Sequence, residues 1–484
     1  MPTLLATAIF ICLIILLFVL DRARDEKVSV ALWIPTIWIS LASSRMVSQW
    51  MGVATAVESS AQAAEGNALD RNILMALIAA GMLVLARRGK SVRALLRSNA
   101  PILIFLSYCA VSVIWSDYPG VAFKRWTKAV GELVMILIVL TELDPSAAIM
   151  RLLTRIGFLL VPTSVLFIKY HPALGRVYGG MAVSHVSYTG VTLDKNMLGV
   201  LCLMAGLNCV AQFIGAYRQA AEKRQVRRLL AQAVVFALVL WLFRIANSMT
   251  PLACFILGSA MIAATSFPGL AGRRATPHLM ALGILAVVVT GLFLDLGADL
   301  VNTMGRNQDL TGRTGLWRDL LRINENPILG TGFESFWLGV RLEKLWAIYW
   351  WRPNEAHNGY LEMFLNLGAV GSSLFGVFVI AGYLKAVKAF RTDPRAGGLI
   401  LALFVVGLAY SFTEAGFRVM HPVWVMFMLA AVADPRLPAA AAARPSPAHG
   451  RGGRFLGVAG GLTPYRPPAR PAARPGVGIA GRAR

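Results

Sequence analysis

The sequence predicts an all-α protein, a polytopic bundle of about 12–13 transmembrane helices with one long structured loop on its non-cytoplasmic face. Of its 484 residues, 57% are hydrophobic and 15% are charged, whereas soluble domains average about 45–50% apolar and about 25% charged residues. Runs without a charged residue recur, for example at 4–20, 281–294 and 399–410. Basic residues gather in the short segments between such runs, which is typical of a multi-pass membrane protein.

The apolar runs and the charges between them place the spans in order along the chain. The first run lacks a basic leader and a small-residue cleavage site, so we expect a retained helix and not a removable signal peptide. The expected spans lie near 3–20, 28–42, 71–86, 100–115, 127–141, 149–168, 197–216, 229–245, 250–266, 277–297, 358–381, 398–412 and 420–433.

The net charge of +23 does not indicate a nucleic-acid partner, because the basic residues follow the membrane topology. The tail at 435–484 is rich in Ala, Pro, Gly and Arg and has no acidic residue. We therefore expect a transmembrane domain at 1–434 followed by a disordered basic cytoplasmic tail that contacts anionic lipid. The positive-inside rule predicts that one face, the cytoplasmic one, carries the basic clusters at 87–97, 218–228, 271–274 and 385–395.

The segment 298–357 is far longer than an ordinary connection and holds equal numbers of acidic and basic residues. Long connections are uncommon unless they are functional, so we expect this one to be structured. Leu316, Leu320 and Ile323 share one stripe of a short amphipathic helix that ends before Pro327. The aromatic run at 344–351 either lies on the outer leaflet of the membrane or packs inside the loop.

The stretch "NEAHNGYLEMFLNLGAVG" at 354–371 places polar side chains where the chain enters an apolar helix. We expect His357 in the first turn of that helix, where the helix dipole disfavours imidazolium and leaves a neutral base. Asn358, Glu362 and Asn366 recur every four residues, so they line one face that must contact protein or a water-filled cavity. The alternative is that His357 is a hydrogen-bonded structural residue.

Cationic residues on the same side of the membrane suggest an anion-binding site. Arg313 begins the amphipathic helix, where a guanidinium and backbone N–H groups can bind phosphate together. The alternative is a solvated face of salt bridges. Arg176 and Lys195 lie in the 169–196 segment, which is basic although it faces away from the cytoplasm. Basic residues on this face run against the positive-inside rule and suggest an anion-binding site. The alternative for Lys195 is that its side chain only extends to the membrane interface.

The sequence contains no recognisable pattern for a metal or a nucleotide cofactor. Its histidines are dispersed, and no Walker loop, dinucleotide fingerprint or nucleophile elbow is present. The five cysteines fall inside apolar runs, which indicates packing and not a disulfide framework. We therefore expect a reaction without a metal or cofactor.

Two stretches resemble a known family. "HNGYLEMFLNLGAVG" at 357–371 is similar to the His-[Asn/Ser/Gln]-x9-Gly-x-x-Gly pattern of the O-antigen ligase and Wzy-type polysaccharide polymerase superfamily, with His357, Asn358, Gly368 and Gly371 at its fixed positions. The segment at 312–337 resembles the part of those proteins that precedes the histidine. "GRTGLW", "EAHNGYLE" and "TLDKNMLG" look closest to exopolysaccharide-production polymerases of the succinoglycan type.

The resemblance implies a metal-independent, inverting glycosyltransferase of the bacterial inner membrane. It implies a periplasmic active site that acts on glycans linked to undecaprenyl diphosphate, with membrane lipid around it and export and chain-length proteins as candidate partners. His357 corresponds to the catalytic histidine, and Arg313 and Arg176 to the arginines that hold the donor diphosphate. We expect Asn358, Glu362 and Lys195 to support them, and Glu362 either orients the base or only satisfies a hydrogen bond in the helix packing. Because this face carries other arginines, the assignment of Arg176 to the diphosphate stays open. The extra N-terminal span departs from the family's usual twelve-helix plan.

Three other functions compete with a polymerase. A ligase that transfers a finished glycan to lipid A-core would share the same site and differ in its acceptor. A transporter of lipid-linked glycans would place charges near the middle of the membrane and repeat its halves, whereas here no internal repeat is evident and the polar residues gather at one face. A scaffold of a polysaccharide complex would not need His357.

Overall fold

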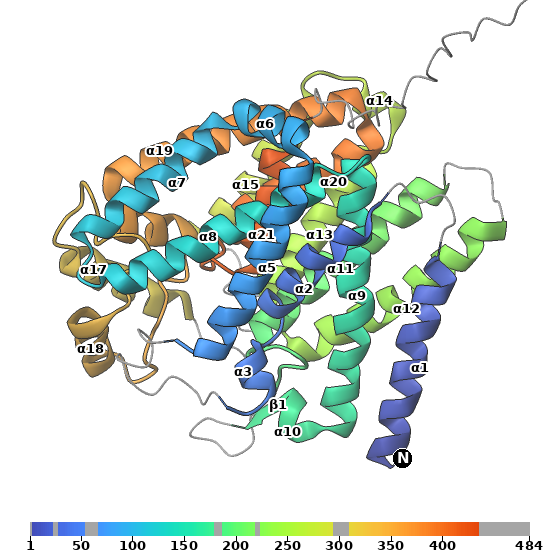
Figure 1. Ribbon diagram of the computed structural model, residues 1–484, viewed down its shortest axis with the longest axis horizontal. Helices are drawn as coiled ribbons and strands as arrows, with labels where there is room; N and C mark the ends of the chain where they lie inside the picture. The colour runs from blue at the N-terminus through green and yellow to red at the C-terminus, as the bar shows by residue number, and fades with distance from the viewer. Residues whose placement is uncertain are drawn as a thin grey trace, which may run out of the picture. The chain divides into compact units, whose positions relative to one another are not determined.

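The computed structural model describes residues 2–22, 28–53, 66–178, 186–217, 223–293 and 309–434. These residues are almost entirely helical, which confirms the all-α prediction (Figure 1). The tail expected at 435–484 and the first residues of the long loop, 298–308, lie outside the described residues.

Within the described residues every predicted span coincides with a helix or part of one, and residues 294–297 of the span expected at 277–297 lie outside them. The first half of the chain forms α1 (Thr3–Asp21), η1 (Val30–Leu32), α2 (Trp33–Ala42), α3 (Val47–Trp50), α5 (Ala68–Arg87), α6 (Gly89–Ser98), α7 (Ala100–Val111), η2 (Ser112–Trp115), α8 (Pro119–Leu140), α9 (Pro145–Tyr170) and α10 (Pro172–Gly175). A short antiparallel hairpin follows, in which β1 (Arg176–Tyr178) pairs with β2 (Val186–Tyr188) and Arg176 lies opposite Tyr188.

The second half forms α11 (Lys195–Tyr217), α12 (Lys223–Ala246), α13 (Met249–Ala264), α14 (Pro268–Ala271), α15 (Thr276–Phe293), α17 (Asp309–Ile323), α18 (Gly339–Ile348), α19 (Gly359–Thr392), α20 (Pro394–Tyr410) and α21 (Pro422–Val432). Helix α17 is the expected amphipathic helix, and its Leu316 and Leu320 are fully buried.

The helices differ in how far they can reach across a membrane. Among the described residues, six are long and apolar enough to cross it: α1, α5, α9, α11, α12 and α19. The pair formed by α6 and α7 with η2 passes the same test together but is bent by 84°. Five further apolar helices are shorter, and α21, with 11 residues, covers only about 16 Å of a hydrocarbon core about 30 Å thick. The 12–13 predicted spans are thus all helical, but not all are long enough to cross a bilayer alone.

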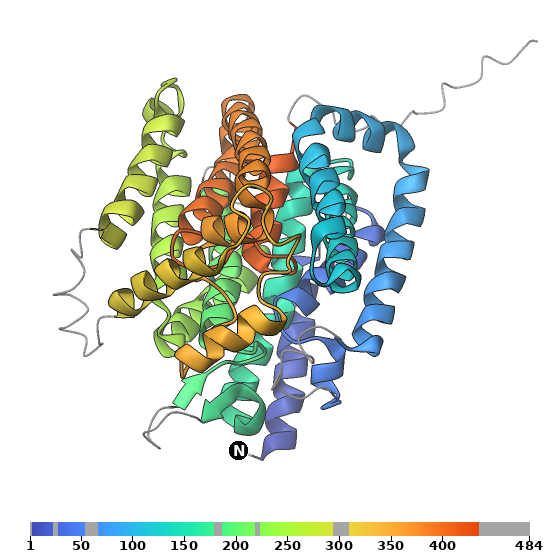
Figure 2. The ribbon, with the colours of Figure 1, turned by 90° about the vertical axis from the view of Figure 1, so that its left-hand side faces the viewer.

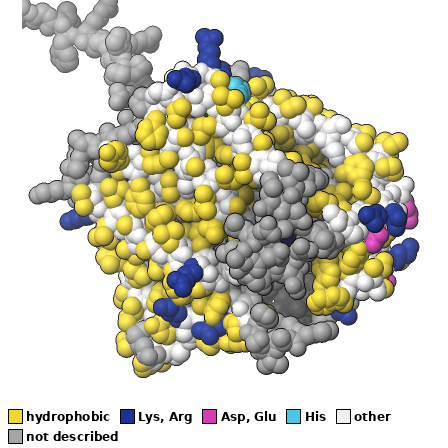
Figure 3. Space-filling view, turned by 180° about the vertical axis from the view of Figure 1, so that it is seen from behind, with side chains coloured by type: hydrophobic (Ala, Val, Ile, Leu, Met, Phe, Trp, Pro, Cys, Tyr) yellow, Lys and Arg dark blue, Asp and Glu magenta, His cyan; other side chains and the backbone are white. Residues whose placement is uncertain are grey.

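The buried core lies among α9, α11, α20 and α21, and in α21 every residue is apolar and buried. A helix that is apolar all round belongs in the centre of a large bundle. Apolar side chains on outer helices stay exposed instead, as Ile15 and Leu83 do, and Figure 3 shows one broad face covered by hydrophobic side chains. Lipid would cover such a face.

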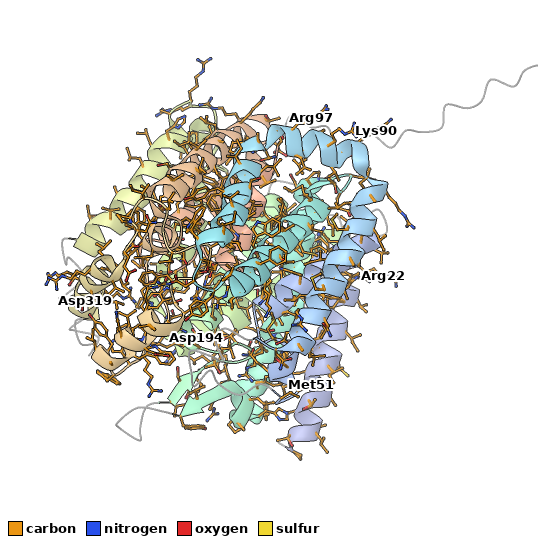
Figure 4. All side chains as sticks on the ribbon, turned by 60° about the vertical axis from the view of Figure 1, so that its left-hand side comes forward. Arg22, Met51, Lys90, Arg97, Asp194 and Asp319 are labelled. Carbon is orange, nitrogen blue, oxygen red and sulfur yellow. The ribbon has the colours of Figure 1, made fainter. Side chains whose placement is uncertain are left out.

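The two ends of the bundle carry different residues. Figure 4 shows Lys90 and Arg97 of α6 at one end and Met51 and Asp194 toward the other.

Helices α17 and α18 lie at the left edge of Figure 1 and face the viewer in Figure 2, beside the first part of α19. They share a second hydrophobic cluster, separate from the main core, that includes Leu316, Phe336, Trp337, Leu345 and Ala356. This cluster fixes the outer loop against the start of α19.

Candidate active site

His357 lies immediately before α19 and not in its first turn. Asn358 is the N-cap, and its side-chain oxygen accepts hydrogen bonds from the backbone N–H groups of Tyr360 and Leu361, each at 3.0 Å. His357 itself has a φ of 50°, a left-handed conformation that costs free energy for a residue with a Cβ. The surrounding loop must therefore hold it in place.

The peptide of Ala356 is held from both sides. Its N–H donates to the Glu362 carboxylate at 2.5 Å, and its carbonyl accepts a hydrogen bond from the Trp317 indole at 2.7 Å. The Trp337 indole also donates to both oxygens of Glu362, at 3.0 and 2.9 Å. Glu362 is 3% exposed, so the expectation that it faces protein is confirmed. Its contacts fix the loop before His357, and it makes no described contact with the imidazole.

A break in α19 fixes the same region from the other side. Gly368 has a φ of 62° inside the helix, where a Cβ would lie 2.2 Å from the carbonyl oxygen of Ile328. The break opens the hydrogen-bond ladder of α19, and the loop at 327–332 replaces the lost partners. Four backbone hydrogen bonds do this: Thr331 N to Leu365 O, Gly332 N to Asn366 O, Ala369 N to Pro327 O and Val370 N to Ile328 O. Gly368 thus lies directly against this loop, where a side chain would not fit.

The connection between α20 and α21, residues 411–421, completes the site. The N–H of Gly359 donates to the carbonyl oxygens of Ser411 (2.8 Å) and Glu414 (3.1 Å), which ties the start of α19 to this connection. Glu414 thereby comes beside His357, with its Oε2 at 3.1 Å from Nδ1. On the other side Oε1 of Glu355 lies 3.0 Å from the same nitrogen.

Positive and negative side chains alternate around His357. Arg313 of α17 donates to the carbonyl of Thr413 at 2.7 Å and pairs with Glu414 at 3.4 Å. Arg418 pairs with Glu355 at 2.8 Å. The order Arg313, Glu414, His357, Glu355, Arg418 therefore places the imidazole between two carboxylates, each of which has an arginine on its far side. We call these five residues the charge cluster.

The protonation of His357 differs from the expectation of a neutral base. Burial alone would lower its pKa, but hydrogen bonds and charges from Glu355 and Glu414 outweigh burial and raise the pKa to about 9. The helix dipole argument was wrong because two carboxylates contact the ring directly, whereas the dipole acts over a longer distance. For Glu355 the directions are reversed. Burial alone would raise the pKa of its carboxyl group, but His357 and Arg418 outweigh burial and lower the pKa to about 2.

The tautomer follows from the partners. An ionised carboxylate only accepts hydrogen bonds, so Nδ1 of His357 carries a proton directed at Glu355 and Glu414. Among the described residues none is hydrogen-bonded to Nε2, and the side chain is 24% exposed. That nitrogen is the one that can exchange a proton with a ligand.

The other predicted site residues lie apart from one another. Lys195 is the first residue of α11, and its neighbour Asp194 caps that helix through Asn196 and Met197. The pKa of Asp194 is raised because protein atoms surround it and because Glu355 and Glu414 repel its charge. Lys195 therefore lies on the same side as the charge cluster.

Arg176 lies on the hairpin. Its Nε donates to the carbonyl of Ile168 at 2.8 Å, and its guanidinium lies over the Tyr188 ring at 5.6 Å. No contact between described residues joins it to His357. The structure thus joins Arg313 to His357 through Glu414 and places Lys195 on the same side as His357. Arg176 has no such link among the described residues.

Ligand atoms for a metal ion are closer together than the sequence suggested. One ligand atom each from Glu355, His357 and Glu414 lies within 4.8 Å of the others. The spacing of histidines in the sequence could not predict this group, because only one of its three members is a histidine. Glu414 also comes from a connection that is distant in the sequence. Both carboxylates are already paired with arginines, so a cation would have to displace two guanidiniums.

Three functional candidates were missed by the sequence reasoning: Glu355, Glu414 and Arg418. One pattern could have revealed the last two. The segment "TEAGFR" at 413–418 is a charged interruption between two apolar runs, on the same side as 354–358.

The fold and the site define a multi-pass membrane protein of all-α class with a charged, histidine-centred site at the end of a broken helix. Residues 228–376 match the family model described as O-antigen ligase, and the matched segment contains Arg313 and His357. This match, to less than half of the chain, supports the O-antigen ligase and Wzy superfamily, whose members are glycosyltransferase-type ligases and polymerases that act on lipid-linked glycans. No curated protein matches the chain. Glu414 and Arg418 lie outside the matched segment, so their role rests on geometry alone.

Proposed function

We propose that the protein is a polysaccharide polymerase that joins repeat units carried on undecaprenyl diphosphate into an exopolysaccharide. The family match supports a lipid-linked glycan as substrate. The observation that carries the proposal is the imidazole of His357, whose Nδ1–H is directed at two carboxylates while Nε2 has no partner among the described residues. This is how a general base is oriented in enzymes.

The proposed orientation places the charge cluster in the periplasm, with the chain in the bacterial inner membrane. Lys90 and Arg97 lie at one end of the bundle, and Asp194 lies toward the other (Figure 4). Because basic connections stay in the cytoplasm, the opposite end faces out. No nucleotide is needed there, since cleavage of the glycosyl–phosphate bond of the donor supplies the free energy.

The reaction is a single displacement with inversion. A hydroxyl oxygen of the acceptor sugar attacks the anomeric carbon of the donor and transfers its proton to Nε2 of His357. The bond between that carbon and the phosphate oxygen breaks, and the lipid diphosphate leaves with the electron pair. With a pKa of about 9, only about one in a hundred His357 side chains is neutral at pH 7. That neutral minority is the reactive form.

Arg313 is the first candidate for the donor diphosphate. Its ion pair with Glu414 is long, 3.4 Å, and its side chain is 25% exposed, so one edge of the guanidinium is open to a phosphate. A positive group there stabilises the charge that develops on the leaving group. Lys195 and Arg176 are proposed as further contacts of the diphosphate. Asn358 and Glu362 support the site by capping α19 and holding the loop before His357.

The proposed reaction needs no metal, because Arg313 and Arg418 already neutralise the carboxylates that would bind one. The corresponding test is activity of the purified protein after treatment with a chelator, compared with the same sample after readdition of Mg²⁺, Mn²⁺ or Zn²⁺. Loss of activity that a metal restores would contradict the metal-free reaction.

The test of function is the polymer size profile in a deletion strain that carries either the wild type or His357→Ala. We expect long chains only with the wild type, and accumulation of single lipid-linked repeat units with the variant at equal protein level. Exopolysaccharide of normal length in the deletion strain would contradict a polymerase. If full-length glycan instead accumulates on the lipid carrier and fails to reach lipid A-core, the ligase is the correct function.

A further inference from the structure

A tight turn beside the charge cluster carries two tryptophans in different settings. The N–H of Arg352 donates to the carbonyl of Tyr349 at 3.0 Å, which closes a turn with Trp350 and Trp351 at its corners. Trp350 is 84% exposed, whereas Trp351 is 38% exposed. Among the described residues only Trp351 of these two has ring partners. The aromatic run was expected either to contact the membrane or to pack inside the loop. Its last two tryptophans differ: Trp350 is exposed, and Trp351 packs against other rings.

Trp351 is held in place on one side by a chain of contacts. The Tyr349 ring meets it edge to face, with ring centroids 5.7 Å apart and planes at 66°. The hydroxyl of Tyr349 donates to a carboxylate oxygen of Asp319 on α17 at 2.8 Å. Arg352 anchors the other end of the turn, because its guanidinium lies 5.5 Å from the centre of the Trp346 ring. The indole of Trp351 is thus oriented before any ligand binds.

The other side of Trp351 meets the site. Its ring centroid lies 6.2 Å from that of His357, with the planes tilted by 34°. A ligand that touches the exposed part of this indole is therefore within reach of the imidazole. Within the charge cluster, Arg313 contacts Glu414 and not the imidazole. Trp351, in contrast, lies against the imidazole ring itself.

The chemistry of an indole selects a sugar over a phosphate. An aromatic face is electron-rich and repels an anion, but it attracts the weakly positive C–H groups that cover one face of a pyranose. Stacking also removes apolar surface from water and leaves the sugar hydroxyls free at the ring edge. Because the indole is already fixed, little conformational entropy is lost on binding.

We propose that Trp351 is the stacking platform for the acceptor sugar, the one whose hydroxyl is deprotonated by His357. The proposal rests on the proposed function and adds a binding subsite to it. Trp351 would orient the acceptor, Arg313 would hold the donor diphosphate, and His357 would lie between them. The ligand class is a neutral pyranose at the end of the acceptor glycan.

The binding test uses the full chain in lipid nanodiscs with His357→Ala, so that no turnover occurs. The probe is the repeat-unit oligosaccharide released by mild acid from the lipid that accumulates in the His357→Ala strain, then radiolabelled. We expect Trp351→Ala to weaken equilibrium binding of this probe about fivefold to tenfold. Trp351→Phe should keep most of the affinity. Trp350→Ala is the matched control, an adjacent and more exposed tryptophan, and should bind as the parent does.

The kinetic test uses the same substitutions in the otherwise wild-type protein. Trp351→Ala should raise KM for the acceptor more than it lowers kcat, because stacking acts in binding, and polymer chains should become shorter. Wild-type affinity and chain length for Trp351→Ala, with His357→Ala still inactive, would overturn the platform and leave the polymerase standing. Equal losses for Trp350→Ala and Trp351→Ala would also overturn it, in favour of a membrane contact. Absence of polymer from the wild type would overturn both proposals.

Discussion

Nδ1 of His357 lies 3.1 Å from Oε2 of Glu414, a residue 57 positions further along the chain. Because this carboxylate and Glu355 raise the pKa of the imidazole, Glu414→Gln should lower it. The variant should also lose activity, by about 10- to 100-fold, because the ring loses part of its orientation. Its pH–rate profile should reach its plateau at a lower pH than that of the wild type. An unchanged profile would show that Glu414 does not act on His357.

The wild-type pH profile is a second prediction. If neutral His357 is the base, the logarithm of kcat/KM should rise with a slope of one per pH unit and level off near pH 9, the pKa of the residue. The measurement is the initial rate in detergent or nanodiscs between pH 6 and 10. A rate that falls with rising pH would mean that the imidazolium, and not the imidazole, is the active form.

The same pKa predicts how stability depends on pH. The pKa of His357 is higher in the folded protein than its usual value of about 6.5, so its interactions with Glu355 and Glu414 stabilise the fold fully below that value. This contribution is lost as the pH rises from about 6.5 through about 9. Thermal unfolding followed by tryptophan fluorescence should show Tm falling over this range. The fall should be smaller in His357→Gln.

Arg313 offers a comparison within one helix. Arg313→Lys should reduce kcat by about 10²-fold, because a point charge does not replace the bidentate guanidinium at a developing phosphate charge. Arg322, also on α17, is the control, since its side chain is 73% exposed and its ion pair with Asp319 is 3.8 Å long. Arg322→Lys should retain wild-type activity. Comparable losses in both variants would indicate a general effect of charge on the helix.

Gly368 offers a test of the broken helix. Gly368→Ala would place a Cβ 2.2 Å from the Ile328 carbonyl oxygen at a φ of 62° and a ψ of −165°, and this conformation alone costs a residue with a Cβ about 1–3 kcal/mol. We expect a lower Tm and loss of activity. Gly376→Ala lies on the same helix and meets nothing within 4 Å, so it should be neutral or slightly stabilising. A neutral Gly368→Ala would show that the loop at 327–332 can move away.

The helices, and the start of α19 within two residues of His357, could be predicted because they depend on local patterns. Apolar runs, the stripe through Leu316 and Leu320, and the polar entry to α19 are all visible within a few turns of sequence. The partners of His357 could not be predicted in the same way. Periodicity says which face of a helix is polar, but not which connection will lie against it. Glu414 is held at the site by the backbone hydrogen bonds of Gly359 and by Arg313, which are contacts between distant parts of the chain.

The charge state of His357 shows the same limit. A helix dipole can be inferred from sequence, but a direct carboxylate contact outweighs it and needs coordinates. The break at Gly368 was equally hidden, because a glycine in an apolar helix more often marks close packing than a change of direction. The tryptophans at 350 and 351 read identically in the sequence, and only their ring contacts distinguish them.

The inserted loop at 327–332 has a mechanical consequence. A continuous helix transmits a change of tilt along its whole length, and membrane helices tilt when the bilayer thickens or thins. In α19 that transmission is interrupted at Gly368, because the turns on either side of it are hydrogen-bonded to the loop in place of one another. The bilayer can thus change in thickness while His357, Glu414 and Arg313 keep their spacing. Catalysis should accordingly be insensitive to acyl-chain length, within the range that the remaining helices tolerate.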